Sequence, residues 1–163
     1  MARVTQHPDV PETVRSLHAL TDLDYVDLFT VEAPDARRHA PAEWARAIME
    51  HAPTMRGGRV LWRLLGLRLG PLGSPDHAGG WTIDGGGDDW VRASVDAPLF
   101  TGRAVVTVDP DAVSLSLAVR YTTRLAPVVW GPVSRAHQRG VPILLREAVQ
   151  IMAVRDAEGD AAS

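Results

Sequence analysis

His137 is the residue whose type and position carry the clearest chemical meaning. It lies in an apolar stripe of three- and four-residue spacing, which also contains Val129, Val133, Val141, Leu144, Ala148 and Met152. If this helical stripe faces a sheet, His137 points into the core or into a cavity. An imidazole changes charge near neutral pH and serves as a general acid or base. The alternative is a structural histidine that is hydrogen-bonded to backbone or to Tyr121.

Three further polar side chains are candidates beside His137. Tyr121 ends the apolar face of the last predicted strand, where its phenol would position a ligand carbonyl or tie the strand to the helix. Tyr25 and Asp27 share one face of the first predicted strand with Phe29. An inward Asp27 would be the carboxylate partner of His137. On an edge strand Asp27 would be solvated, and this is the outcome we expect.

Several kinds of chemistry are excluded by composition and spacing. The chain has no cysteine and no lysine, which excludes disulfides, thiolate chemistry and Schiff-base catalysis. Its six histidines show no HxH or HExxH spacing, so we expect no metal site. Neither Gly-x-Ser-x-Gly nor Gly-x-Gly-x-x-Gly occurs, and we expect no cofactor.

Length and charge favour one globular domain. The chain has 163 residues, of which 45% are hydrophobic, and a net charge of −3. Nothing in this charge favours nucleic acid as a partner. No apolar run is long enough for a transmembrane helix, and the first residues turn polar where a signal peptide would be apolar. We therefore expect no integral membrane segment and a cytoplasmic location.

The candidate residues are placed by an alternating pattern followed by a helical one. Alternation predicts a first strand over residues 22–31 and an antiparallel meander over 81–123, with one covered face. A helix is predicted over 11–20, before the first strand. Two more are predicted between that strand and the meander, over 41–51 and 54–69, and Pro53 separates them. The final helix runs over residues 127–156 and is kinked near Pro142. Residues 1–10 and 157–163 are predicted to be flexible termini of a single domain over 11–153.

Arginines mark two further surfaces. Arg56, Arg59 and Arg63 lie along one face of the predicted helix 54–69, which would either rest on an anionic membrane or cover a cavity with its arginines in water; we expect the latter. Three arginines on successive strands, at 92, 103 and 120, would form an anion-binding patch or pair with acids such as Asp96. We expect pairing.

Five segments resemble a known superfamily. They are residues 24–29 (Asp-Tyr-Val-Asp-Leu-Phe), 44–46 (Trp-Ala-Arg), 121–125 (Tyr-Thr-Thr-Arg-Leu), 134–137 (Ser-Arg-Ala-His) and 141–146 (Val-Pro-Ile-Leu-Leu-Arg). With the order of elements, they resemble an uncharacterised bacterial branch of the SRPBCC superfamily, which contains START-like lipid carriers and polyketide cyclases. The resemblance covers roughly residues 11–153. It implies an α+β helix-grip fold, in which an antiparallel sheet wraps around a long C-terminal helix with a cavity between them.

The resemblance leaves three functions open. The first is binding of a small hydrophobic molecule, lipid- or polyketide-like. The alternative is a cofactor-free cyclase or dehydratase in which His137 or Tyr121 moves protons. The third is a homodimer that associates through its sheet and has lost its cavity. We expect the ligand to contact the following residues: Tyr25, Asp27, Phe29, Trp62, Phe100, Trp130, Val133 and Val141.

Overall fold

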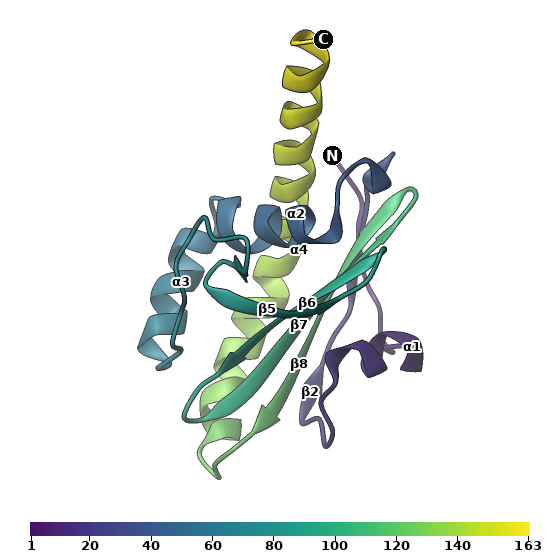
Figure 1. Cartoon of the computed structure of the whole chain (residues 1–163). Helices are drawn as coiled ribbons and strands as arrows, with labels where there is room; N and C mark the ends of the chain where they lie inside the picture. The colour runs from purple at the N-terminus through teal and green to yellow at the C-terminus, as the bar shows by residue number, and fades with distance from the viewer.

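A computed structural model describes all residues from Met1 to Ser163. The chain forms an eight-stranded antiparallel sheet wrapped around one long C-terminal helix (Figure 1), which is the predicted helix-grip arrangement of the α+β class. The strand order is β1-β3-β8-β7-β6-β5-β4, and β2 pairs with β8 beside β3. No helix is long and apolar enough to cross a membrane.

The alternating pattern located the strands of the meander correctly. Four strands follow one another as antiparallel neighbours: β5 (Trp81–Gly86), β6 (Trp90–Asp96), β7 (Phe100–Asp109) and β8 (Ala112–Tyr121). On β8 the residues Val113, Leu115, Leu117 and Val119 join the core, as their alternation predicts. A short strand, β4 (His77–Ala78), completes this side of the sheet.

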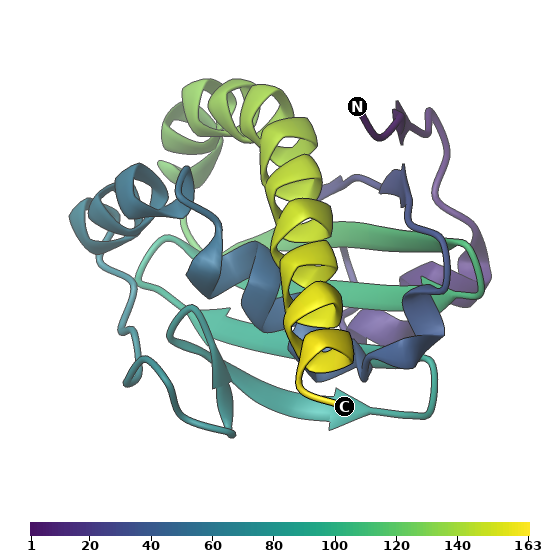
Figure 2. The same cartoon turned by 90° about the horizontal axis from the view of Figure 1, so that it is seen from above.

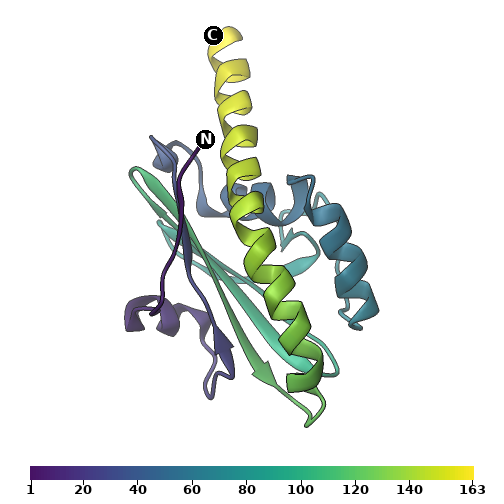
Figure 3. The same ribbon diagram turned by 180° about the vertical axis from the view of Figure 1, so that it is seen from behind.

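Helix α4 (Ala126–Ala161) lies on one face of the sheet, called here the inner face. It contains Pro132 and Pro142 and curves along its length (Figure 2), as expected where a proline removes a helical hydrogen bond. Its buried residues include Val141, Leu144 and Met152 of the predicted stripe. The helix continues to Ala161, beyond the predicted end at residue 156, and its last turns extend past the sheet (Figure 3).

Two helical segments cover the rest of the inner face. Helix α2 (Pro41–Arg46) continues into the π-helical turn η3 (Ala47–His51), and after Pro53 the chain forms α3 (Met55–Leu64). The predicted break at Pro53 is confirmed, but the predicted end of α3 at residue 69 is wrong. Gly66 takes a φ of 79°, and the N–H groups of Gly66 and Leu67 donate to the carbonyls of Arg63 and Trp62. This is a Schellman cap, which a glycine at this position favours.

The N-terminal segment departs most from the prediction. Residues 1–10 include strand β1 (Val4–Gln6), which pairs with β3 (Phe29–Glu32) at the edge of the sheet. Helix α1 (Glu12–Arg15) and the 3-10 turn η1 (Ser16–His18) then cover the outer face, which the alternation left uncovered (Figure 1). His18 is 0% exposed, and its Nε2 lies 2.9 Å from Oγ of Ser116, a buried residue of β8.

The buried His18 makes stability dependent on pH. Burial lowers the pKa of His18 from 6.5 to about 4. The unfolded chain therefore takes up a proton between pH 6.5 and 4 that the folded protein does not. Stability from this group is fully present above this window and falls as the pH decreases through it. We predict that His18 accounts for a loss of about 3 kcal/mol across the window.

Chemical denaturation of the wild type and of His18→Gln at a series of pH values tests this prediction. Glutamine does not titrate, so the variant should lack this part of the pH dependence. His51→Gln, at an exposed histidine, is the matched control and should keep the wild-type profile. Equal profiles for the wild type and His18→Gln would contradict the prediction.

Candidate functional site

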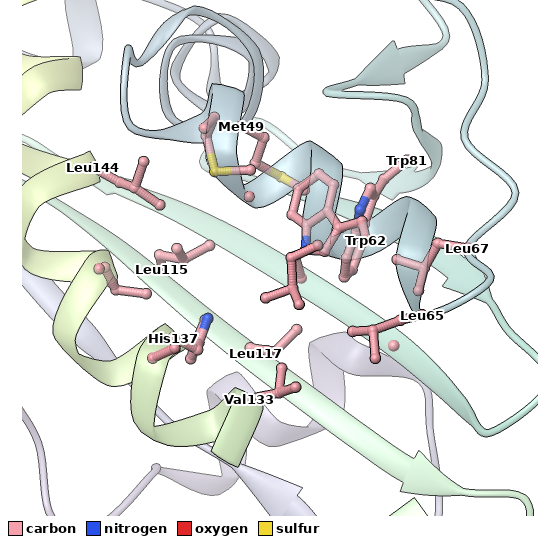
Figure 4. A pocket seen from close by; sticks show the side chains of 18 of the residues that line it. Met49, Trp62, Leu65, Leu67, Trp81, Leu115, Leu117, Val133, His137 and Leu144 are labelled. Atoms are coloured by element: carbon pink, nitrogen blue, oxygen red, sulfur yellow. The ribbon is translucent and has the colours of Figure 1, made fainter. Parts of the chain in front are cut away.

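The sheet, α3 and α4 enclose a cavity of about 350 Å³ (Figure 4). Eighteen of its 24 lining residues are hydrophobic. Apart from the tryptophans, the lining residues with polar side chains are Thr54 and His137. The hydroxyl of Thr54 donates to the carboxylate of Glu147 at 2.7 Å. His137 is therefore the one titratable group that lines the cavity.

Local structure explains how aromatic rings reach this cavity. The cap after α3 places Leu67 next to Trp62 at the helix end, and both residues line the cavity. The rings of Trp62 and Trp81 pack with their centroids 5.2 Å apart. A Cβ at Gly102 would lie 3.2 Å from the Trp81 ring, so the absence of a side chain at Gly102 lets the indole lie on the sheet.

His137 lies on α4 against the sheet, beside Leu115 and Leu117 (Figure 4). Its Nε2 is 2.8 Å from Oδ2 of Asp27. The edge-to-face neighbours of its ring are Tyr25 and Phe29, at centroid distances of 6.4 and 6.5 Å. The predicted orientation of His137 towards the sheet is thus confirmed.

Asp27 is the centre of the polar network behind His137. It is 5% exposed, so the expectation that it would be solvated is wrong. Its carboxylate also accepts the Tyr25 hydroxyl at 2.6 Å and the backbone N–H of Leu117 at 3.0 Å. The prediction failed because Asp27 is on the inner face, where α4 covers it and His137 of that helix contacts its carboxylate.

The Asp27 side chain also explains why the predicted first strand is divided into β2 (Tyr25–Val26) and β3. Both halves share one register on β8, with Val26 opposite Ala118 and Phe29 opposite Leu115. Asp27 therefore lies opposite Leu117, and its N–H donates to the Leu117 carbonyl at 3.0 Å. The return bond from Leu117 goes to the carboxylate of Asp27 instead of its carbonyl. That carbonyl accepts the hydroxyl of Ser116.

These bonds determine the tautomer of His137. The Tyr25 hydroxyl and the Leu117 N–H are donors, as an ionised carboxylate requires. Burial, and then the charge of Asp27, raise the pKa of Tyr25, which keeps its phenol a donor. An ionised carboxylate has no proton to donate, so in the contact between His137 and Asp27 the proton resides on Nε2. Nδ1 then carries a lone pair, and the one hydrogen bond of the His137 side chain within the protein is the one through Nε2.

The structure brings together most of the predicted site residues, but in two groups. The cavity is lined by His137, Trp62, Phe100, Trp130, Val133 and Val141. Tyr25, Asp27 and Phe29 lie behind His137 and do not line it. Tyr121 is also outside the lining and makes no side-chain hydrogen bond to His137; of the partners considered for His137, the structure has Asp27.

Sequence reasoning missed some residues of the site. Gln138 donates to the Tyr25 hydroxyl at 3.2 Å, and no sequence signal marks it. Trp81 and Met49 line the cavity as well; a large aromatic residue at a strand start was a usable signal for Trp81. The expected pairing of strand arginines is confirmed for Arg92 with Asp84, at 2.8 Å, and for Arg103 with Asp96, at 3.3 Å.

No family model matches the chain, and no curated protein matches it. The class of protein is therefore defined by its fold and its site: it is a helix-grip protein with an apolar cavity. The one titratable residue that lines this cavity is a histidine, which is hydrogen-bonded to a buried aspartate. No group of three or more potential metal ligands occurs.

The Asp27 carboxylate should control the His137 tautomer. In Asp27→Asn the amide oxygen still accepts from Leu117, whereas the amide nitrogen faces Nε2 of His137 and makes it an acceptor. We predict a switch of the proton to Nδ1 and a loss of about 1–3 kcal/mol of stability. Imidazole ¹⁵N NMR at mildly alkaline pH measures the tautomer. Tyr25→Phe, which removes one donor and keeps the carboxylate, should retain the proton on Nε2. A wild-type spectrum for Asp27→Asn would contradict the assignment.

Proposed function

We propose that the protein binds a small hydrophobic molecule, lipid- or polyketide-like, in the cavity between the sheet and α4. The observation that carries the proposal is the nearly apolar lining of a cavity of about 350 Å³. Small-molecule sites have this character, with a few polar groups that fix the ligand's orientation. This protein belongs, in our proposal, with the ligand-binding helix-grip proteins of the SRPBCC superfamily.

His137 gives the ligand a chemical requirement. Its Nδ1 is an acceptor when the ring is neutral, so it favours a ligand that presents a hydroxyl group. A carboxylate would place its lone pairs against this nitrogen and its charge near Asp27, which disfavours an anionic ligand. An apolar ring or chain that carries a hydroxyl fits the wall best.

Two further wall residues favour an oxygenated ligand. The indole N–H groups of Trp81 and Trp130 are buried without a partner in the protein. Buried donors are normally hydrogen-bonded, and small adjustments of either ring would let it donate to ligand oxygens.

Three naphthalene derivatives test the proposal by calorimetry at neutral to mildly alkaline pH. We predict that 2-naphthol binds more tightly than 2-methoxynaphthalene, which lacks a donor, and that 2-naphthoate binds weakest. Saturation at a hundredfold excess over Kd should stabilise the fold by about 2.7 kcal/mol in a thermal melt. His137→Phe should lose the preference for naphthol and keep the methoxy compound, which also reports that the variant is folded.

A pair of glycine variants on α4 locates the binding. A Cβ at Gly140 or at Gly159 meets nothing within 4 Å, but only Gly140 lines the cavity. Gly140→Phe should weaken binding of every probe by at least roughly tenfold, as expected when a side chain fills the pocket. Gly159→Phe should bind like the wild type. Absence of binding by the wild type, or equal affinities for both variants, would overturn the proposal.

A second function, proton transfer, is favoured by one specific observation. The Asp27 carboxylate holds the proton on Nε2 of His137 and offsets the charge of an imidazolium. Nδ1 is thereby prepared to take a proton as a general base. Here His137 would be the catalytic residue of a cofactor-free cyclase or dehydratase, and Asp27 would be a positioning residue.

Deuterium exchange tests this second function. The base takes an α-proton of 1-tetralone, the C–H electron pair forms the enolate, and the imidazole returns a deuteron after exchange with D₂O. We predict faster loss of the α-proton NMR signal with the wild type than in buffer, and no acceleration with His137→Phe. Tyr121→Phe, outside the cavity lining, should exchange like the wild type. A buffer rate for the wild type would exclude this function and leave ligand binding intact.

A further inference from the structure

Helix α3 has two faces of different chemistry. One face lines the cavity with Gly58, Leu61 and Trp62. The other face, called here the α3 outer face, consists of Arg56, Val60, Arg63 and Leu64, which are all exposed. Val60 is 60% exposed and Leu64 is 80% exposed, so two aliphatic side chains project into water beside two exposed arginines. The two neighbouring aliphatic side chains form a small exposed apolar patch on α3.

The charge around this face is of one sign. Residues 51–75 contain four arginines and no acidic residue, although the whole chain has a net charge of −3. Arg56, Arg63 and Arg68 are exposed and form no ion pair. The carboxylates next to this segment are occupied: Glu50 accepts from the backbone of Gly73 and Gly79, and Glu147 accepts from Thr54.

The start of α4 adds exposed aliphatic side chains at the same end of the molecule. Leu125 is 67% exposed and Val128 is 75% exposed, and Arg124 beside them is exposed as well. Figures 1 and 3 show α3 and the first turns of α4 on the inner side of the sheet towards this end, and both helices line the cavity. Exposed aliphatic and cationic residues thus flank the cavity from two elements.

We propose that the α3 outer face docks on the surface of an anionic lipid bilayer. Arginines attract anionic headgroups, while isolated aliphatic side chains reach the boundary of the acyl region; one surface thus satisfies both features of this face. A symmetric contact with a second copy would place the arginines of one α3 against those of the other. A hydrophilic acidic partner would leave Val60 and Leu64 without apolar surroundings.

Docking through α3 would bring the cavity next to the apolar interior of the bilayer. The same helix forms the cavity wall and the membrane-facing surface, so an apolar ligand would move between bilayer and cavity with little exposure to water. The docking itself is independent of ligand binding; only this use of it rests on the proposed function.

Sedimentation with vesicles tests the docking. The wild type should bind vesicles of equal parts phosphatidylglycerol and phosphatidylcholine and should not bind pure phosphatidylcholine. Arg56→Gln/Arg63→Gln should reduce the partition coefficient roughly 30-fold, because each arginine near an anionic surface contributes about fivefold. The control Arg37→Gln/Arg155→Gln removes the same charge from exposed arginines outside α3 and should bind like the wild type.

A further double variant distinguishes contact of the aliphatic side chains with lipid from attraction by charge alone. Val60→Ser/Leu64→Ser keeps both arginines and should bind anionic vesicles more weakly and with a steeper salt dependence than the wild type. Absence of vesicle binding by the wild type, or equal binding by Arg56→Gln/Arg63→Gln, would overturn the docking proposal. Calorimetry of that arginine variant with 2-naphthol, without vesicles, should match the wild type, so failure of docking is distinguishable from failure of ligand binding.

Discussion

The carboxylate of Asp27 is the interaction on which the site depends, because it joins three elements at one buried point. It accepts from Leu117 of β8, from Tyr25 of β2 and from His137 of α4. A buried carboxylate is costly unless all its hydrogen bonds are made, so these partners are held in place together. The sheet gives up one regular ladder bond at Asp27, and the hydroxyl of Ser116 satisfies the carbonyl that this frees. The orientation of the histidine on α4 is thereby set by the backbone of the sheet.

This arrangement confines polarity to one wall of the cavity. Elsewhere the lining comes from the apolar side chains of β8, β7 and α3, and the long helix α4 closes the remaining side. Prolines in α4 let the helix curve over the sheet, while glycines at 57, 58 and 140 leave space on the cavity side. The core therefore packs densely around Leu145 and stays open beside His137. An opening of this size has a cost in a well-packed core, because side chains that line a void lose dispersion energy on that side.

The sequence predicted the sheet and the grip helix well because both have strong periodic signals. Alternation from Val113 to Tyr121 assigns faces without knowledge of the neighbours, and the stripe through Val141 and Leu144 marks the buried side of α4. The sequence did not predict properties that depend on contacts between segments far apart in the chain. The burial of Asp27 depends on a helix more than a hundred residues later, which places His137 against its carboxylate. The covered outer face likewise depends on η1, which follows from no pattern in β8.

The same histidine serves both candidate functions, and the acidity of the bound molecule decides between them. A hydroxyl group that is a weak acid donates to Nδ1 and stays intact, so His137 anchors the ligand. A carbon acid beside a carbonyl can lose its proton to the same nitrogen, because the resulting imidazolium is next to the Asp27 carboxylate. Turnover also requires a donor for the enolate oxygen, and the indole N–H groups of Trp81 and Trp130 are buried donors without a partner among the lining residues. Whether these rings reach the oxygen of a bound ketone separates a carrier from a catalyst in this fold.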